Sequence, residues 1–328
     1  AFALVLCGPL AMYLISEHYT HDLDEMWVDP MKLGIILYYL IFFVLFAITG
    51  RIWAGICLEG LIVGLAGLAN YFVLQFRNAP IMPWDIYSIG VASSVAGEYD
   101  YDLTARVIVV ILSLLAICII SCLCRFRLKN LKLRLALVAV SLLSFTGFAK
   151  YVQSDVVDDL FEIDRTLFTP TVYYRNNGYM LSFLINMRYL NIEKPAGYSA
   201  AEAEAVLENA LQTEDTQLLS RDTGLHPNII VIMNEAFSDL SVLGDYQTNL
   251  PVTPYLDEME ALGEVTKGYA YSSVKGGNTA NAEYEFLTGF SMQFLPVGSI
   301  PYQQYIRSEL PGMVMDLNEL GYTSVALH

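Results

Sequence analysis

Hydrophobic residues are concentrated in five stretches within the first half of the chain. The stretches cover about residues 1–16, 32–50, 52–76, 105–124 and 133–149. Each approaches or reaches the roughly 20 residues that a helix needs to cross a bilayer. After about residue 195 the composition becomes that of a water-soluble protein. The pattern predicts a five-span helical membrane domain at residues 1–150, followed by a water-soluble part.

The charges of the loops predict the orientation of these spans. The connection RFRLKNLKLR (125–134) is strongly basic, and Arg51 lies in the tight turn between the second and third spans. In contrast, residues 18–30 and 97–102 are acidic. Basic loops face the cytoplasm by the positive-inside rule. We therefore expect a multi-pass protein of the cell membrane, with a cytoplasmic N-terminus and an extracellular domain after residue 150.

Two aromatic segments adjoin the membrane on the outer side. RNAPIMPWDIYS (77–88) could contact a lipid headgroup, but a structural turn is favoured. VYYRNNGYMLSFLINMRYL (172–190) fits equally well a helix along the membrane surface or a buried strut beneath the soluble domain. With the helix at 200–212, capped by Ser199, these elements assign residues 151–224 to a juxtamembrane helix and linker.

The remaining residues, 225–328, alternate between strand and helix patterns. Asn228–Met233 is a short apolar run typical of a strand buried on both faces, and further strands are expected at 263–274 and 323–328. Helices are expected at 253–262, with Pro254 in the first position, and at 310–322. This alternation predicts an incomplete α/β domain with a largely parallel sheet.

Charge and cysteine content narrow the possible functions. The formal net charge of -16 argues against a nucleic-acid partner, because phosphate binding needs clustered Lys and Arg. All five cysteines lie in or beside apolar segments, so the soluble part has none. Disulfides and cysteine-based metal sites are therefore not expected there.

Three polar residues follow predicted strands, where α/β sheets bind ligands. They are Glu235, Thr279 in KGGNTANAEYEF (275–286), and His328. Alone, each has an ordinary structural explanation: a loop acid, a helix cap and a histidine with no special role. Together they fit phosphoryl transfer, in which a divalent cation bound by Glu235 activates the Thr279 hydroxyl and backbone N–H groups of the glycine loop bind phosphate.

At these motifs the chain resembles the lipoteichoic acid synthase family, phosphoglycerol transferases of the alkaline phosphatase and sulfatase superfamily. The resemblance rests on NIIVIMNEAFSDL, TPYLDEM, GGNTANAEYEFLTG, PYQQYI and GYTSVALH, in that order. It implies a sulfatase-like fold with Thr279 as the nucleophile. Glu235 and the Thr279 oxygen would bind Mn²⁺, Mg²⁺ or another divalent cation, and His328 would contact the substrate phosphate. The implied reaction transfers glycerol phosphate from phosphatidylglycerol to a glycolipid or polymer of the cell surface.

The sequence departs from the family in two places. Ala280-Asn281 stands where the family has Ser-Asp, and the family's further metal ligands, an Asp-His pair, would lie beyond His328. We therefore expect a fragment that is inactive alone.

Two other functions stay open. One is a phosphoethanolamine transferase of the same superfamily, against which the cysteine-free soluble part counts. The other is a non-catalytic membrane protein with a degenerate domain. An intramembrane charge such as Glu59 would support that function, unless the side chain is only a packed residue of its span. A sulfatase is disfavoured, because the sequence motif that carries the sulfatase nucleophile is missing.

Overall fold

The computed structural model assigns the chain to two units, of which Ala1–Asn191 and Pro296–Glu309 form the first, and Ile192–Leu295 and Leu310–His328 the second. The structure describes residues 1–88, 90, 102–167, 169–190, 192, 194, 197–213, 227–234, 237, 244, 248–268, 270–274, 279–296 and 299–327.

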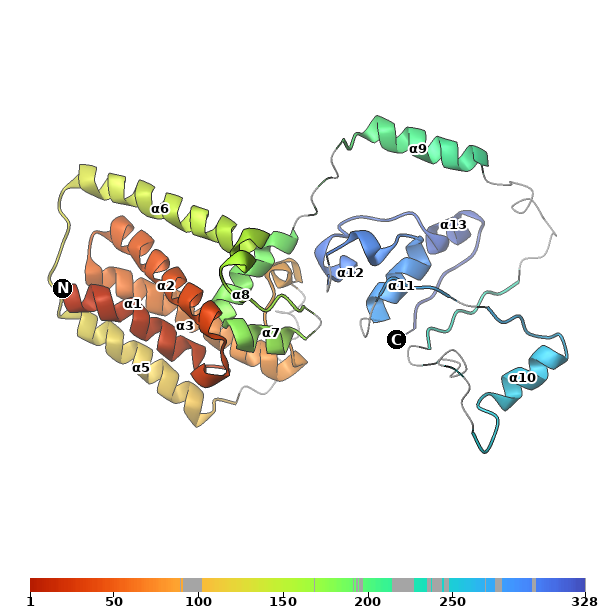
Figure 1. The fold of residues 1–328 in the computed structure, drawn as a ribbon, viewed down its shortest axis with the longest axis horizontal. Coiled ribbons are helices and arrows are strands. Elements are labelled where there is room, and N and C mark those ends of the chain that lie inside the picture. Colours follow the sequence, from red (N-terminus) through yellow and green to blue (C-terminus); the bar gives the residue numbers. More distant parts are fainter. Residues whose placement is uncertain are drawn as a thin grey trace. The chain divides into compact units, whose positions relative to one another are not determined.

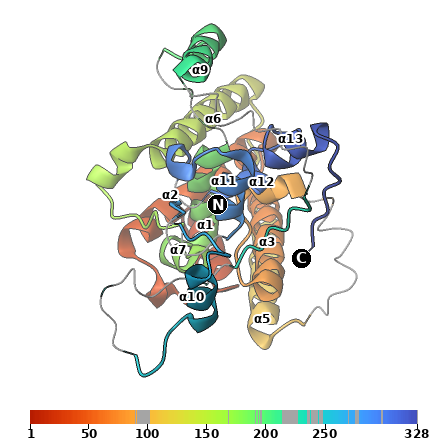
Figure 2. The same ribbon diagram turned by 90° about the vertical axis from the view of Figure 1, so that its right-hand side faces the viewer.

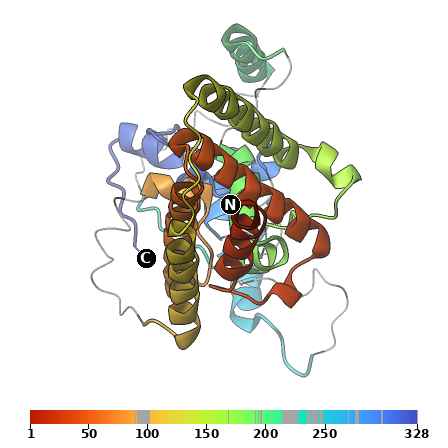
Figure 3. The same ribbon diagram turned by 90° about the vertical axis from the view of Figure 1, so that its left-hand side faces the viewer.

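Five helices side by side form the body of the first unit (Figures 1 and 3). They are α1 (Phe2–Glu17), α2 (Val28–Thr49), α3 (Ile52–Arg77), α5 (Ala105–Cys122) and α6 (Leu131–Gln153). The last four are long and apolar enough to span a membrane and fit a multi-pass membrane protein. The span expected at about residues 1–16 is not confirmed. The 16 residues of α1 extend only about 24 Å, whereas the hydrocarbon core of a bilayer is about 30 Å thick.

Local sequence explains where these helices begin and end. Gly50 adopts a left-handed conformation (φ 65°) and ends α2, and the chain then enters α3 after Arg51. Arg51 forms an isolated antiparallel bridge with Arg127, so the two basic connections lie together at one end of the bundle. The side chains of Thr104 and Asn130 cap α5 and α6 by accepting the backbone N–H groups of Val107 and Leu133.

Aromatic side chains fill the centre of the bundle where small residues let helices approach. Tyr13, Tyr38 and Phe42 are completely buried there. A methyl group on Gly67 would lie 2.5 Å from the Tyr19 ring, so α3 can pack against the end of α1 only with a glycine at this position. Many apolar side chains on the outer faces remain exposed, as expected for helices surrounded by lipid.

The two aromatic segments described above pack into the first unit. Residues 170–186 form α7 (Pro170–Asn177) and α8 (Tyr179–Asn186), separated by Gly178, and Tyr173 and Leu181 are almost fully buried. Trp84 is buried in the 3₁₀ helix η2 (Pro83–Ser88), which favours the structural turn.

Residues 296–309 belong to this unit despite their distance in sequence. Within them, α12 (Pro301–Gln304) packs against η2. The Arg307 guanidinium stacks 3.9 Å above the Tyr87 ring, and the Tyr305 hydroxyl donates to the Tyr189 carbonyl at 3.1 Å.

The second unit contains α9 (Ala200–Thr213), α10 (Pro254–Ala261), α11 (Thr279–Thr288), the 3₁₀ helix η8 (Met292–Phe294) and α13 (Met313–Glu319). These agree with the predicted helices at 200–212, 253–262 and 310–322, and Ser199 caps α9 as expected by accepting the Glu202 N–H at 3.2 Å. The methyl group of an alanine at position 312 would lie 2.4 Å from the Leu287 carbonyl, so Gly312 allows α13 to begin against α11.

The predicted parallel sheet is not found among the described residues, where Figures 1 and 2 show helices and no strand. Residues 228–233 are not paired with another segment, and the side chains of Ile230 and Ile232 are 83% and 82% exposed. A strand exists only through hydrogen bonds to a neighbouring strand, which the described part of these segments lacks. Within the described part of these segments, the apolar pattern alone is therefore not sufficient to define a sheet.

Candidate active site

Thr279 is the first residue of α11 and is partly buried. The helix is fixed on one side by the buried residues Asn281 and Tyr284. It ends at Thr288, and Gly289, which follows, has a φ of 73°. The first turn of a helix has backbone N–H groups without intrahelical partners and carries a partial positive charge. An anionic group next to the Thr279 hydroxyl is therefore favoured, as a phosphoryl acceptor would require.

Glu285, six residues after Thr279, binds the segments that precede and follow α11. Its Oε2 accepts the Ser272 hydroxyl at 2.6 Å and the Ser273 N–H at 3.2 Å, and its Oε1 accepts the Ser273 hydroxyl. Oε1 also accepts the Met292 N–H at 2.7 Å. One carboxylate therefore attaches the chain just before the glycine loop and the chain just after α11 to the same helix.

These hydrogen bonds hold Glu285 in its charged form. Partial burial opposes ionisation, but the hydrogen bonds from Ser272, Ser273 and the Met292 N–H outweigh it and lower the pKa of Glu285 to about 2. The residue was not identified from sequence, because no local pattern connects a glutamate in a helix with a serine pair twelve positions earlier. We define Glu285 and its donors Ser272, Ser273 and Met292 as the Glu285 clamp.

Of the predicted site residues, only Thr279 is among the described ones. Glu235, His328 and residues 275–278 of the glycine loop lie outside them. Nowhere in the described ranges do three or more His, Cys, Asp or Glu side chains form a group that could hold a metal ion. The described residues thus provide one hydroxyl oxygen toward a divalent cation and no complete ligand set, so the predicted metal site at Glu235 and Thr279 stays a prediction.

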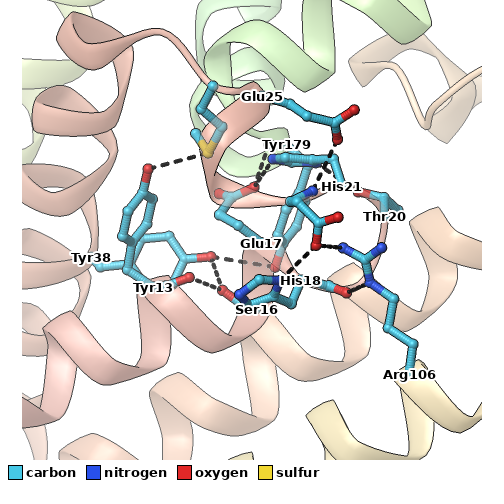
Figure 4. Close-up of polar contacts among 12 residues, drawn as sticks. Tyr13, Ser16, Glu17, His18, Thr20, His21, Glu25, Tyr38, Arg106 and Tyr179 are labelled. Atoms are coloured by element: carbon cyan, nitrogen blue, oxygen red, sulfur yellow. Dashed lines mark hydrogen bonds and ion pairs between the residues drawn. The ribbon is translucent and has the colours of Figure 1, made fainter.

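A second concentration of polar groups lies at the end of α1 (Figure 4). The Glu17 carboxylate, 1% exposed, accepts the Tyr179 N–H at 3.1 Å and lies 3.4 Å from the His21 Nε2. The Tyr179 hydroxyl donates to the Val63 carbonyl at 2.7 Å. Burial lowers the pKa of His21 to about 4, so its imidazole is neutral at pH 7. These contacts connect α1, α3 and α8 and have a structural role.

Glu59 in α3 differs from this cluster because it is isolated. Its side chain is 0% exposed, and neither carboxylate oxygen has a hydrogen-bond partner in the part of the chain that the structure describes. A carboxyl group inside a membrane span is costly unless it is neutral or has a function.

A comparison with known protein families finds a match in the C-terminal third of the chain. The family described as Sulfatase matches residues 227–328, which include Thr279 and the Glu285 clamp. A relative named "Putative cyclic beta-1,2-glucan modification protein", from Rhizobium meliloti (strain 1021), is 37% identical over 190 residues, or 57% of this chain. The chain spans about a quarter of that relative's length, since the alignment covers 27% of it.

No solved structure matches the chain. The sulfatase match is nevertheless consistent with the site, because the matched residues include a hydroxyl at a helix N-terminus. Residues 227–328 therefore carry a sulfatase-family domain of the alkaline phosphatase and sulfatase superfamily, attached to a helical domain that fits a multi-pass membrane protein.

Proposed function

We propose that this chain is part of a membrane-anchored phosphoglycerol transferase with Thr279 as its nucleophile. The observation that carries the proposal is the position of Thr279 at the N-terminus of α11 inside the sulfatase match, with the Glu285 clamp on both sides. Such a hydroxyl lies at a helix N-terminus, where the helix charge and the backbone N–H groups of the first turn favour a phosphoryl group.

The reaction has two displacements at phosphorus. The Thr279 oxygen attacks the phosphate of phosphatidylglycerol and loses its proton; the bond to diacylglycerol breaks, and diacylglycerol leaves as the protonated alcohol. An acceptor hydroxyl then attacks the glycerophosphoryl-threonine, and the Thr279 hydroxyl is regenerated. A divalent cation such as Mn²⁺, held by Glu235 and the threonine oxygen, would supply charge stabilisation to the alkoxide. His328 would contact the phosphate.

The acceptor we propose is a glycan or polymer on the extracellular side of the cell membrane. The name of the Rhizobium relative, a putative glucan modification protein, supports a glycan acceptor. The resemblance to lipoteichoic acid synthases supports a polymer of glycerol phosphate. The basic connections around Arg51 and Arg127 support a cytoplasmic location for that end of the bundle and an extracellular location for the catalytic domain.

The test is mass spectrometry of the full-length protein after incubation with phosphatidylglycerol vesicles and Mn²⁺. We expect a glycerophosphoryl adduct on the peptide that contains Thr279, and no adduct in Thr279→Ala. Thr288→Ala is the matched control, because it removes a hydroxyl from the other end of the same helix. An unmodified Thr279 during turnover, or turnover that is unchanged in Thr279→Ala, would refute the mechanism.

Phosphatidylethanolamine as donor in the same experiment tests the alternative. A phosphoethanolamine adduct on Thr279, in place of the glycerophosphoryl group, would keep the nucleophile and change the donor. The isolated carboxyl of Glu59 favours a second candidate, a non-catalytic membrane protein with a degenerate domain. Absence of adducts with both lipids would favour that candidate.

A further inference from the structure

A cavity of about 450 Å³ lies between the end of α1 and the first half of α5. On the α5 side it is lined by Arg106, Val109, Val110 and Ser113. These positions follow the i, i+3, i+4, i+7 spacing of one helix face, so they form a continuous stripe along α5. Ile15, His18 and Asp22 line the opposite side. We call this space the α1–α5 groove.

The groove has a charged rim and is mainly apolar below it. Its rim carries Arg106, Asp22 and His18, whose side chains are 40%, 60% and 42% exposed. Below the rim it is lined by Ile15, Val109 and Val110, and Ser113 lies at the far end of the stripe. Arg106 and Ser113 are seven positions apart, which corresponds to about 10 Å along the helix. This is the order and depth of groups that a phospholipid presents, from its headgroup to its first methylenes.

The charged groups of the rim can form hydrogen bonds beyond those they make to each other (Figure 4). The Arg106 Nε donates to the His18 carbonyl at 2.7 Å, and its Nη2 donates to the Asp22 Oδ1 at 2.8 Å. Within the described residues, the Arg106 Nη1 makes no hydrogen bond. The Asp22 carboxylate also accepts the Glu25 N–H and lies 3.5 Å from the His18 Nδ1, and its two oxygens have about four lone-pair sites in all, so acceptor capacity is left. A guanidinium and a carboxylate thus lie side by side, each able to make a further hydrogen bond.

This charge pattern selects the headgroup. A phosphate can bind the Arg106 Nη1, and a primary ammonium can donate to a remaining lone pair of the Asp22 carboxylate, without breaking the existing ion pair. An anionic headgroup would bring uncompensated negative charge next to Asp22. A choline headgroup has no N–H to donate.

We propose that the α1–α5 groove binds one aminophospholipid of the phosphatidylethanolamine class. Its phosphate contacts Arg106, its ammonium contacts Asp22, and the first part of an acyl chain lies along Ile15 and Val109. The lipid belongs to the leaflet on the Asp22 side, which the proposed orientation makes the outer leaflet. The inference does not depend on the transfer chemistry at Thr279.

The experiment is native mass spectrometry of the full chain in detergent, titrated with phosphatidylethanolamine, phosphatidylglycerol or phosphatidylcholine. We expect one phosphatidylethanolamine to be retained in preference to the other two lipids. Arg106→Gln removes the charged phosphate contact and should weaken that binding about tenfold. Arg77→Gln is the matched control: Arg77 is also 40% exposed and paired with an aspartate, Asp85, but does not line the groove, so binding should be unchanged.

Two further variants keep the test valid if Arg106→Gln fails to fold. Asp22→Asn, at a position exposed to solvent, should remove the preference for phosphatidylethanolamine over phosphatidylglycerol. Val109→Trp fills the groove from a lipid-facing position and should reduce retention of every lipid. Equal retention of the three lipids by the unmodified protein, preferential retention of phosphatidylglycerol, or unchanged binding in folded Asp22→Asn and Val109→Trp would overturn the proposal.

Discussion

The Glu285 clamp makes a quantitative prediction for Glu285→Gln. The substitution keeps the size of the side chain but removes its charge, and it places an amide NH₂ against groups that all donate: the Ser273 and Met292 N–H groups and two serine hydroxyls. At least one of these donors must lose its partner. Residues 272–274 and 291–292 should therefore detach more often from α11.

Two estimates of the cost agree. Lowering the pKa of Glu285 from 4.5 to about 2 corresponds to an upper limit of about 3 kcal/mol. Because the side chain is partly exposed, solvent screening reduces this to roughly 2 kcal/mol. A lost hydrogen bond to a charged group independently contributes about 1.5–3 kcal/mol. A cost of about 2 kcal/mol raises the population of the open state about thirtyfold.

Amide hydrogen exchange of the full-length protein in detergent measures this population. Peptides that cover residues 270–274 and 279–292 should exchange up to about thirtyfold faster in Glu285→Gln, whereas peptides from α2 and α3 should not change. The control is Glu283→Gln, an exposed carboxylate on the same helix. Equal exchange in the Glu285 and Glu283 variants would refute the clamp.

The clamp also predicts a dependence on pH. Because folding lowers the pKa of Glu285, its contribution is complete above pH 4.5 and is lost as the pH falls toward about 2. After correction for the intrinsic exchange rate, protection of these peptides should decline over that range in the unmodified protein. Glu285→Gln should lack this component of the decline, and an identical decline in both proteins would contradict the assignment.

The remaining predictions concern the membrane half and can be measured as thermal unfolding in detergent. Gly178→Ala should destabilise the protein by about 2–3 kcal/mol, because a non-glycine residue is strained there (φ 83°, ψ 150°) and its methyl group would lie 2.9 Å from Glu17 and Met26. The control is Gly147→Ala, because nothing lies within 4 Å of the added methyl group at that position. Equal melting temperatures of the two variants would contradict the packing around Gly178. Glu59→Gln should melt at the same or a higher temperature, because it removes an unpaired buried carboxyl group; a large loss would show that Glu59 has a partner in the folded state.

The helices could be predicted from sequence because their signals are local. Four long apolar runs, the left-handed glycine at position 50, the serine cap at 199 and Pro254 each act within a few residues, and the structure contains the corresponding helix boundaries. Glycine 178 divides the aromatic segment 172–190 into two helices, a break that its apolar pattern alone does not indicate.

The parts that could not be predicted depend on contacts between distant residues. The β-branched run Asn228–Met233 has strand propensity, but a strand also needs a paired neighbour. The Glu285 clamp joins residues 272, 285 and 292, and their meeting is set by how the chain folds back on α11. Of the candidate site, Thr279 could be placed on a helix N-terminus from sequence; the positions of Glu235 and His328 relative to it stay predictions.

The path of the chain through the two units affects how the protein responds to cleavage. The chain passes between the units after Asn191, after Leu295 and after Glu309, and residues 296–309 are held in the first unit by the Arg307–Tyr87 and Tyr305–Tyr189 contacts. A protease that cuts once, anywhere between residues 197 and 213, therefore leaves the C-terminal fragment anchored by these contacts. The two fragments should migrate together in a native gel and separate in SDS, so a nick in this region would not shed the sulfatase-family domain from the membrane.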